Sequence, residues 1–424
     1  MGGPNRAVAA LTVAKLLSTA GSWMSTVALP WLVLTTTGSP AQMSMVLAAQ
    51  VAGIVLLGLP SGPLVARLGV RGSLLLGDAC RAPLVAAIPI LFHLDALAFP
   101  AILAISFTIG GFTASYVAAQ RLAVPELVGT QPNAVARANS LIDGATRIGN
   151  LIGPAVAGVL IAVVGAADVL WFDAATFLVS FLIVLLFIKI RRRSASPPAL
   201  AAPHSPASRW TPAGVRYLAS DRVLRWMAAA VLLVGITYPL LMVVLPVLTQ
   251  VRYGGDPRTF GILMSANGLG LAIGSLLTIW LSGKWPIARL GGIAAVGAMA
   301  PLWLLLQPLS PTLTAAVLAV SGIFIPTFSA CLTSHFTLRP PDPVRPQVMT
   351  SVITMENLTS FAAYASGGAL LTIAGIQPVL VIVAVAGTAC ALSLLVAVKP
   401  FKAAPGDIRS PKASSAFDKH GRVG

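Results

Sequence analysis

The sequence predicts an all-α membrane protein in which twelve transmembrane helices form two pseudo-repeated six-helix bundles. Of its 424 residues, 57% are hydrophobic and only 9% are charged, against about 25% charged in a soluble domain. Apolar runs of about 20 residues, the length that spans a bilayer, recur along the whole chain. A polar break near the middle divides these runs into two groups. This composition excludes a soluble enzyme, and it leaves too little polar surface for a nucleic-acid binder despite a net charge of +16.

Twelve apolar runs, separated by Gly, Pro, Ser and charged residues, mark the expected helices. Six precede the break, near residues 7–36, 43–64, 73–93, 99–123, 136–164 and 169–190. Six follow it, near residues 224–249, 259–282, 289–309, 312–338, 348–374 and 378–398. We therefore expect an N-terminal bundle at 1–190, a hydrophilic linker at 191–223, a C-terminal bundle at 224–398 and a basic tail at 399–424. The run that begins at Ala7 is too long for a signal-peptide core, so we expect it to be retained as a helix.

The distribution of Lys and Arg predicts the topology, because cytoplasmic loops of membrane proteins are enriched in these residues. One orientation places most of the 28 Lys and Arg residues in inside loops, the linker and the tail, and leaves only Arg252 and Arg258 in outside loops. We therefore expect a multi-pass protein of the cell (inner) membrane with both termini in the cytoplasm. The basic tail is expected to contact anionic lipids.

Six plus six helices joined by a basic central segment resemble the major facilitator superfamily. After the second expected helix, Gly62, Arg67, Gly69 and Arg71 are similar to the superfamily's signature for a gating loop, although Ala66 occupies its acidic position. The resemblance implies two halves that rock around a central site. The substitution at Ala66 removes the carboxylate that the family uses to close the inner side.

The fifth expected helix carries the spacing Gly149-x-x-x-Gly153-Pro154-x-x-x-Gly158. It is similar to the motif that marks exporters in the superfamily, where glycines permit close helix contact and proline bends the helix. Other segments resemble the macrolide-efflux and enterobactin-exporter branch, and they are Leu76–Arg81, Val124–Leu127, Ala138–Leu141, Asp173–Phe177 and Gly214–Leu218. We expect Gly153 and its neighbours in the motif to pack against another helix.

Ionisable residues inside the expected spans are the candidates for energy coupling. Gly283-Lys284 lacks the spacing of a phosphate-binding loop, so we expect an ion gradient, most simply of protons, rather than ATP. Proton coupling requires a carboxylate that exists in both protonation states. The candidates and their possible charge partners are Asp78 with Arg81, Asp143 with Arg147, and Glu356 with Lys15. The alternative for each is a structural salt bridge, and for Lys15 a side chain that extends toward the cytoplasm.

The resemblance implies a central cavity lined chiefly by the first, fourth, seventh and tenth helices. Aromatic and polar residues midway along these and adjacent spans are Trp23, Phe112, Tyr238, Phe324 and Asn267. Together they suit a bulky amphipathic ligand, since aromatic faces offer large apolar contacts. The alternative is that each packs between helices or faces lipid.

These observations predict a secondary active exporter of a drug-like or secondary-metabolite molecule that works by alternating access and proton antiport. The alternative within transport is an importer of a small organic solute. A membrane enzyme or receptor is disfavoured because no cluster of His, Asp or Glu gathers at one membrane face. We expect a monomer that acts on a small molecule, protons and lipids, with no catalytic residue, metal site, cofactor or nucleic-acid partner.

Overall fold

The computed structural model describes residues 4–58, 61–129, 131–188, 212–282, 284–341 and 343–398, and these residues form helices, turns and no strand. The N-terminal bundle contains α1 (Pro4–Thr37), α2 (Pro40–Gly58), α3 (Ser61–His93), α4 (Phe99–Val128), α5 (Pro132–Val164) and α6 (Ala166–Phe187). The expected tail at 399–424 and most of the expected linker lie outside the described residues.

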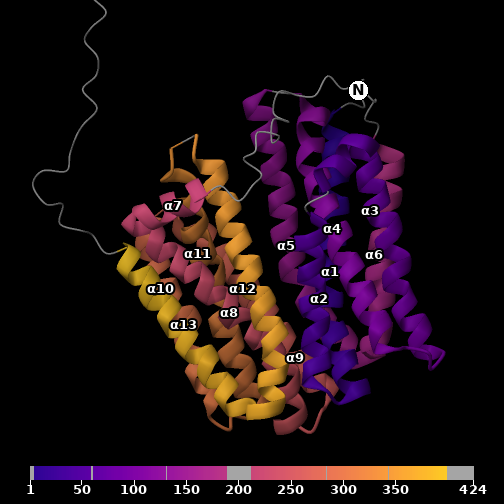
Figure 1. The fold of residues 1–424 in the computed structure, drawn as a ribbon, viewed down its shortest axis with the longest axis vertical. Helices are drawn as coiled ribbons and strands as arrows, with labels where there is room; N and C mark the ends of the chain where they lie inside the picture. Colours follow the sequence, from indigo (N-terminus) through magenta and orange to yellow (C-terminus); the bar gives the residue numbers. More distant parts are fainter. Residues whose placement is uncertain are drawn as a thin grey trace, which may run out of the picture.

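The C-terminal part contains α7 (Pro212–Ser220), α8 (Arg222–Arg252), α9 (Pro257–Ser282), α10 (Ile287–Met299), the 3-10 helix η2 (Ala300–Leu306), α11 (Pro311–Leu338), α12 (Arg345–Ala374) and α13 (Ile376–Val398). The two bundles stand side by side in Figure 1, with the N-terminal bundle in indigo to magenta and the C-terminal bundle in red to yellow.

The two bundles repeat one packing scheme. In the N-terminal bundle α1 packs on α5 and α6, α4 packs on α2 and α3, and α3 packs on α6. The C-terminal bundle shows the same pairs: α8 on α12 and α13, α11 on α9 and α10, and α10 on α13. The halves meet through α2 with α12 and through α5 with α9, which are equivalent pairs under the repeat. The expected pseudo-repeat of two six-helix bundles is therefore confirmed.

Three helix boundaries differ from the sequence-based expectation. The second helix ends at Gly58 rather than near residue 64, and the expected gating loop instead forms the first turns of α3. The segment expected to be a hydrophilic linker contains a helix, α7, which packs against α8 and α12. The span expected at 289–309 changes from α-helix to 3-10 helix at Ala300, and Pro301, which lacks a backbone N–H, lies in the first turn of η2.

Among the described residues, eleven helices are long and apolar enough to cross a membrane. They match eleven of the twelve expected spans, and the twelfth, α12, falls outside this group. It has the required length at 30 residues. Its first two-thirds contain Glu356 and a series of Ser, Thr, Asn and Gln residues that lower its hydropathy. Because α12 packs between α8 and α2, the least apolar span lies where the two halves meet.

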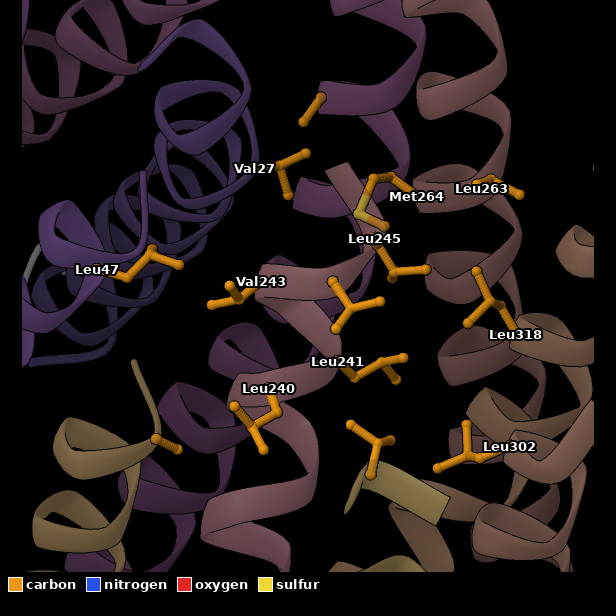
Figure 2. Packing of buried hydrophobic residues seen from close by; sticks show 14 of the residues in the cluster. Val27, Leu47, Leu240, Leu241, Val243, Leu245, Leu263, Met264, Leu302 and Leu318 are labelled. Atoms are coloured by element: carbon orange, nitrogen blue, oxygen red, sulfur yellow. The ribbon is translucent and has the colours of Figure 1, made fainter. Parts of the chain in front are cut away.

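Two hydrophobic clusters hold the molecule together. The larger cluster takes side chains from both halves, and Figure 2 shows Val27 of α1 and Leu47 of α2 beside Val243 and Leu245 of α8. The smaller cluster contains only N-terminal residues, such as Leu11 of α1 and Leu74 of α3. Buried apolar surface therefore joins the halves in one part of the bundle, while the smaller cluster stabilises the N-terminal bundle alone.

Candidate functional site

The contacts between the halves gather at one end of the bundle, here called the closed end. It is formed by the C-termini of α1, α5 and α12 and the N-termini of α2 and α9. Trp31 of α1 stacks on Phe260 of α9, with ring centroids 4.3 Å apart and planes inclined by 9°. Ser44 accepts a hydrogen bond from the backbone N–H of Gly368 at 3.1 Å, which joins α2 to α12. Stacking, hydrogen bonds and apolar burial together hold this end shut.

The opposite end, here called the open end, includes the start of α1 and the end of α13. There α5 and α12, whose far ends hold the halves together, have exposed side chains. Leu141, Asp143 and Arg147 of α5 are exposed, as are Ile353 and Glu356 of α12. The halves therefore meet tightly at the closed end and leave polar and charged side chains accessible toward the open end.

The glycine motif of α5 contacts two different helices. A Cβ on Gly153 would lie 2.5 Å from the Cβ of Trp23 and 2.8 Å from the carbonyl oxygen of Ala20, and one on Gly149 would lie 2.8 Å from the Cβ of Thr19, so both glycines face α1. Pro154, next to Gly153, is buried inside the helix. The expectation that the motif packs against a neighbouring helix is confirmed.

Gly158, the last glycine of the motif, instead faces the other half. A Cβ on it would overlap the backbone carbonyl of Gly261 in α9 and approach the Ser265 hydroxyl. That hydroxyl donates a hydrogen bond of 2.9 Å to the carbonyl oxygen of Ala155 in α5. The motif therefore tightens the N-terminal bundle with two glycines and joins the two bundles with the third.

Asp78 and Arg81 form the expected ion pair inside the N-terminal bundle. The guanidinium Nη2 lies 2.5 Å from Asp78 Oδ1, and the two side chains are 2% and 0% exposed. Ser180 of α6 donates to the other carboxylate oxygen at 2.6 Å. The rings of Tyr116 and Phe177 flank the guanidinium, with centroids 4.5 and 4.3 Å from its Cζ. Such saturation of both charges is the pattern of a structural element that joins α3, α4 and α6.

Asp143 and Arg147 do not form the expected ion pair, although they are four residues apart on α5. Both are exposed, and no ion pair among the described residues includes either of them. Their four-residue spacing on one helix is therefore not sufficient to bring the two charges together. Glu356 likewise has no ion-pair partner in the described part of the chain.

Lys15 does not pair with Glu356, the partner suggested by the sequence. Its Nζ lies 5.8 Å from the centroid of Tyr116. The charges that act on Lys15 are those of Asp78, Arg81, Asp143 and Arg121, all in the N-terminal bundle. Lys15 therefore lies within electrostatic range of residues on α3, α4 and α5, a grouping that local spacing does not reveal.

The aromatic residues expected to line the cavity have different surroundings. Trp23 donates from Nε1 to Asn150 Oδ1 of α5 at 2.8 Å, and the Tyr238 hydroxyl donates to Asn267 Oδ1 of α9 at 3.3 Å. Trp23 and Tyr238 are half-buried, and Asn267 is buried. Each aromatic side chain thus has a polar group fixed beside an apolar face, which is the usual composition of a small-molecule site.

The other two aromatic candidates are less informative. Phe324 of α11 packs on Gly297 of α10, where a Cβ would lie 2.5 Å from the ring, so its role is packing within the C-terminal bundle. Phe112 of α4 is half-buried. These placements favour Trp23 and Tyr238 as ligand contacts over Phe324.

The expected gating loop lies in the first turns of α3 at the open end. Gly62 and Arg67 are exposed, and Gly69 interrupts the helix with φ 73°, a conformation that residues with a Cβ rarely adopt. Arg71 donates from Nη2 to the carbonyl oxygen of Leu185 in α6 at 2.9 Å. The segment therefore contacts its own half in this conformation.

Asp173 of α6, which the sequence analysis named only as part of the segment Asp173–Phe177 and not as a coupling candidate, is a buried carboxylate. It is 1% exposed, accepts a hydrogen bond from the Ser25 hydroxyl of α1, and lies 3.3 Å from the Thr176 hydroxyl oxygen. No ion pair in the described part of the chain includes it. An acidic residue within the apolar run 169–190 is the sequence signal that could have identified it.

Comparison with known proteins places this arrangement in a family. The family model described as Major Facilitator Superfamily matches residues 11–364. The chain is similar to the multidrug efflux pump Tap of Mycolicibacterium fortuitum, with 29% identity over 268 residues, and to its Mycobacterium tuberculosis counterpart, with 28% identity over 275 residues. The matched regions cover 62% of this chain in both cases, and 64% and 62% of the two relatives, which is less than two-thirds of either pump.

Solved structures share the fold at low sequence identity. The nucleoside transporter NupG superposes with a TM-score of 0.73 at 13% identity, covering 92% of this chain and 99% of NupG. A bacterial homologue of the iron transporter ferroportin, in an inward-facing state, gives 0.69 at 12% identity, with 93% and 99% covered. The D-xylose-proton symporter gives 0.67 at 13% identity, with 91% and 96% covered.

Proposed function

The chain belongs to the Major Facilitator Superfamily and is a multi-pass membrane transporter rather than an enzyme, and we propose that it exports amphipathic small molecules by proton antiport. The observation that carries the proposal is the α5 glycine motif. Gly149 and Gly153 pack on α1 while Gly158 packs on α9. One helix thus connects the interior of the N-terminal bundle to the contact between the halves. The similarity to multidrug efflux pumps supports the direction of transport.

The expected topology determines from which side of the membrane a substrate would enter this conformation. If both termini lie in the cytoplasm and the protein is in the inner membrane, the open end faces the cytoplasm and the closed end faces outward. Trp23 and Tyr238, each hydrogen-bonded to an amide side chain, provide aromatic faces for a substrate entering from the cytoplasm or the inner leaflet. Rocking of the halves then exposes the site to the outside.

Proton antiport is the proposed energy source because accessible carboxylates lie along the open end. Asp143 and Glu356 are exposed toward it and lack ion-pair partners in the described part of the chain. A carboxylate in this setting exchanges protons with cytoplasmic water and responds to a cation or dipole on the substrate. Import of a small organic solute is the alternative direction of transport.

Accumulation in cells tests the function. Cells with and without the protein are loaded with ethidium or a macrolide, and intracellular levels are compared before and after a protonophore collapses the proton gradient. An exporter lowers the accumulation of at least one compound, and the protonophore removes the effect. Gly153→Leu, whose side chain would overlap Trp23, is the matched inactive variant. Increased accumulation in the presence of the protein supports the importer.

A further inference from the structure

The α1–α6 contact contains a carboxyl group without a neutralising charge. Asp173 is 1% exposed, and its described hydrogen-bond partners are the hydroxyls of Ser25 and Thr176. The Thr176 hydroxyl lies closer to the Asp173 backbone carbonyl oxygen, at 2.7 Å, than to the carboxylate at 3.3 Å. Ser25 is therefore the main side-chain partner of the Asp173 carboxylate.

Arg81 is the charged group that acts on Asp173, but it is already committed to other groups. Its Nη2 binds Asp78 at 2.5 Å, and its Nε donates to the carbonyl oxygen of Gly77 at 3.0 Å. Among the described contacts of Asp173, α1 contributes the Ser25 hydroxyl, α3 contributes the charge of Arg81, and α5 contributes none. Lys15 acts on Asp78 but is not among the charges that act on Asp173, so Asp173 has only the guanidinium already bound to Asp78 and would, if ionised, be a poorly compensated buried charge.

The surroundings of Asp173 suit a neutral carboxylic acid. A protonated carboxyl group has one O–H donor and retains acceptor capacity, and a serine hydroxyl can serve as either donor or acceptor. Gly21 of α1 has no side chain at this point, and a Cβ there would overlap Asp173 Oδ1 and Thr176 Oγ1. The close approach of α1 to α6 thus encloses the carboxyl group and excludes water from it.

Helix α1 connects this carboxyl group to the proposed substrate site. Ser25 binds Asp173 of α6, and Trp23, two residues earlier, binds Asn150 of α5. Trp31 follows Ser25 by six residues, or about 9 Å along the helix axis, and its ring stacks on Phe260 of the other half. The helix that carries Trp23 at the proposed substrate site is thus the same helix that encloses Asp173.

We propose that Asp173 holds a proton in the substrate-free conformation seen here and releases it when a substrate engages Trp23 and moves α1 relative to α6. The inference rests on the proton antiport proposed above, and adds a buried proton-binding residue to the accessible carboxylates. In the release step the carboxyl O–H bond breaks, and the proton passes to water at the open end. The carboxylate that remains is stabilised by the entering water and by the nearby charge of Arg81. Reprotonation from the outside then completes one exchange of a proton for a substrate.

Infrared spectroscopy measures the protonation directly. The full-length protein in lipid nanodiscs at neutral pH is compared with Asp173→Asn, the neutral isostere of the protonated form. The matched control is Asp168→Asn on the same helix, since Asp168 is 40% exposed and pairs only with His93 in the described residues. The protonated-carboxyl C=O band is expected in the wild type and in Asp168→Asn and absent from Asp173→Asn. A band of unchanged intensity in Asp173→Asn overturns the inference.

Ser25→Ala provides a second spectroscopic variant if Asp173→Asn does not fold. Loss of the serine hydroxyl removes a hydrogen bond from the carboxyl group, so the same band is expected to shift in frequency. A band that neither shifts nor loses intensity in Ser25→Ala contradicts the assignment to Asp173.

Transport in proteoliposomes tests the role of the proton. Ethidium is the probe, with a pH gradient imposed across the membrane. Asp173→Asn is expected to equilibrate ethidium downhill but to lose gradient-driven accumulation, whereas Asp168→Asn retains it. Gradient-driven accumulation at the wild-type rate in Asp173→Asn overturns the inference. A wild-type protein that never concentrates ethidium contradicts the proposed function instead, and the infrared band still determines whether Asp173 is protonated.

Discussion

Gly158 of α5 and Gly261 of α9 lie so close together that a Cβ on either residue would overlap the backbone carbonyl oxygen of the other. The contact is reciprocal and lies in the bundle interface, where α5 of the first half meets α9 of the second. Because backbone rather than a flexible side chain would be displaced, neither position tolerates a larger residue without separating the helices. The two glycines therefore set how tightly the closed end can shut.

Gly158→Ala is expected to destabilise the closed end by about 1–3 kcal/mol, the usual cost of overpacking. Gly144→Ala on the same helix is the matched control, because a Cβ there meets nothing within 4 Å. This control should be neutral or stabilising by about 0.5–1 kcal/mol. Thermal unfolding in detergent and ethidium efflux measure the two effects. Equal melting temperatures and equal efflux for the two variants would show that the glycine contact is incidental.

The fold could be predicted because apolar length and polar interruptions are local properties of the sequence. All twelve expected spans correspond to helices, including α12, whose polar residues leave it below the hydropathy of the others. Helix ends were less predictable. The segment Pro212–Ser220 reads as a continuation of a hydrophilic linker, yet it forms α7, and Gly214 packs within reach of Gln347 and Ser351 of α12. That contact depends on a residue more than a hundred positions away.

The candidate site was predictable only where partners share a helix turn. Asp78 and Arg81 are three residues apart and pair as expected. Asp143 and Arg147 have a similar spacing, yet both are exposed and no ion pair of the described residues includes either of them. Lys15 and Asp173 find their partners on other helices. Which helices pack together is a property of the tertiary structure, so spacing alone could not identify these contacts.

Asp78→Asn is expected to destabilise the N-terminal bundle by about 3–5 kcal/mol, because Arg81 would remain as an unpaired buried charge. Combining Asp78→Asn with Arg81→Leu removes both charges and should recover part of the lost stability. The quantity to measure is folded protein in the membrane, together with the melting temperature of the purified variants. If the single and double variants lose equal stability, the two charges are not energetically coupled.

Stability should also depend on pH through Asp221, which caps α8 outside the membrane spans. Partial burial alone would raise its pKa, but hydrogen bonds from the Leu224 N–H and from Arg339, 2.8 Å away, hold the pKa of Asp221 below its usual value. A lowered folded-state pKa stabilises the protein above the unfolded pKa of about 3.9, and this contribution is lost as pH falls through the folded value.

Arg339→Gln is therefore expected to reduce the melting temperature slightly at neutral pH and to have less effect near pH 3. The contribution is at most about 1 kcal/mol, because Arg339 is 45% exposed and solvent screens the pair. Arg258→Gln, which replaces an exposed residue in the first turn of α9, is the control for the loss of a surface charge. A destabilisation that is the same at both pH values would contradict the role of the Asp221 carboxylate.

The expected topology predicts that residue 205 faces the cytoplasm and residue 258 faces outward. Single cysteines at Ser205 and Arg258 are introduced into a background that lacks Cys80, Cys331 and Cys390. An impermeant maleimide added to intact cells should label the cysteine at 258 and leave the one at 205 unmodified until the cells are opened. Labelling at 205 in intact cells would show that the orientation is the reverse of the expected one, with the open end facing outward.

Neutral substitution of Asp143 and Glu356 distinguishes proton coupling from a structural role. Both carboxylates are exposed toward the open end, and neither has an ion-pair partner in the described residues. Their removal leaves no buried charge behind, so Asp143→Asn and Glu356→Gln should accumulate in the membrane at wild-type levels. If at least one of them exchanges protons during transport, its variant should bind ethidium yet fail to export it against a gradient. Arg147→Gln, which removes a neighbouring exposed charge from α5, controls for the general effect of losing an exposed charge from this helix. Wild-type, pH-dependent efflux in both carboxylate variants would exclude these two residues as coupling sites and leave Asp173 of α6 and Glu126 of α4, the other carboxylates in the described spans that no ion pair includes.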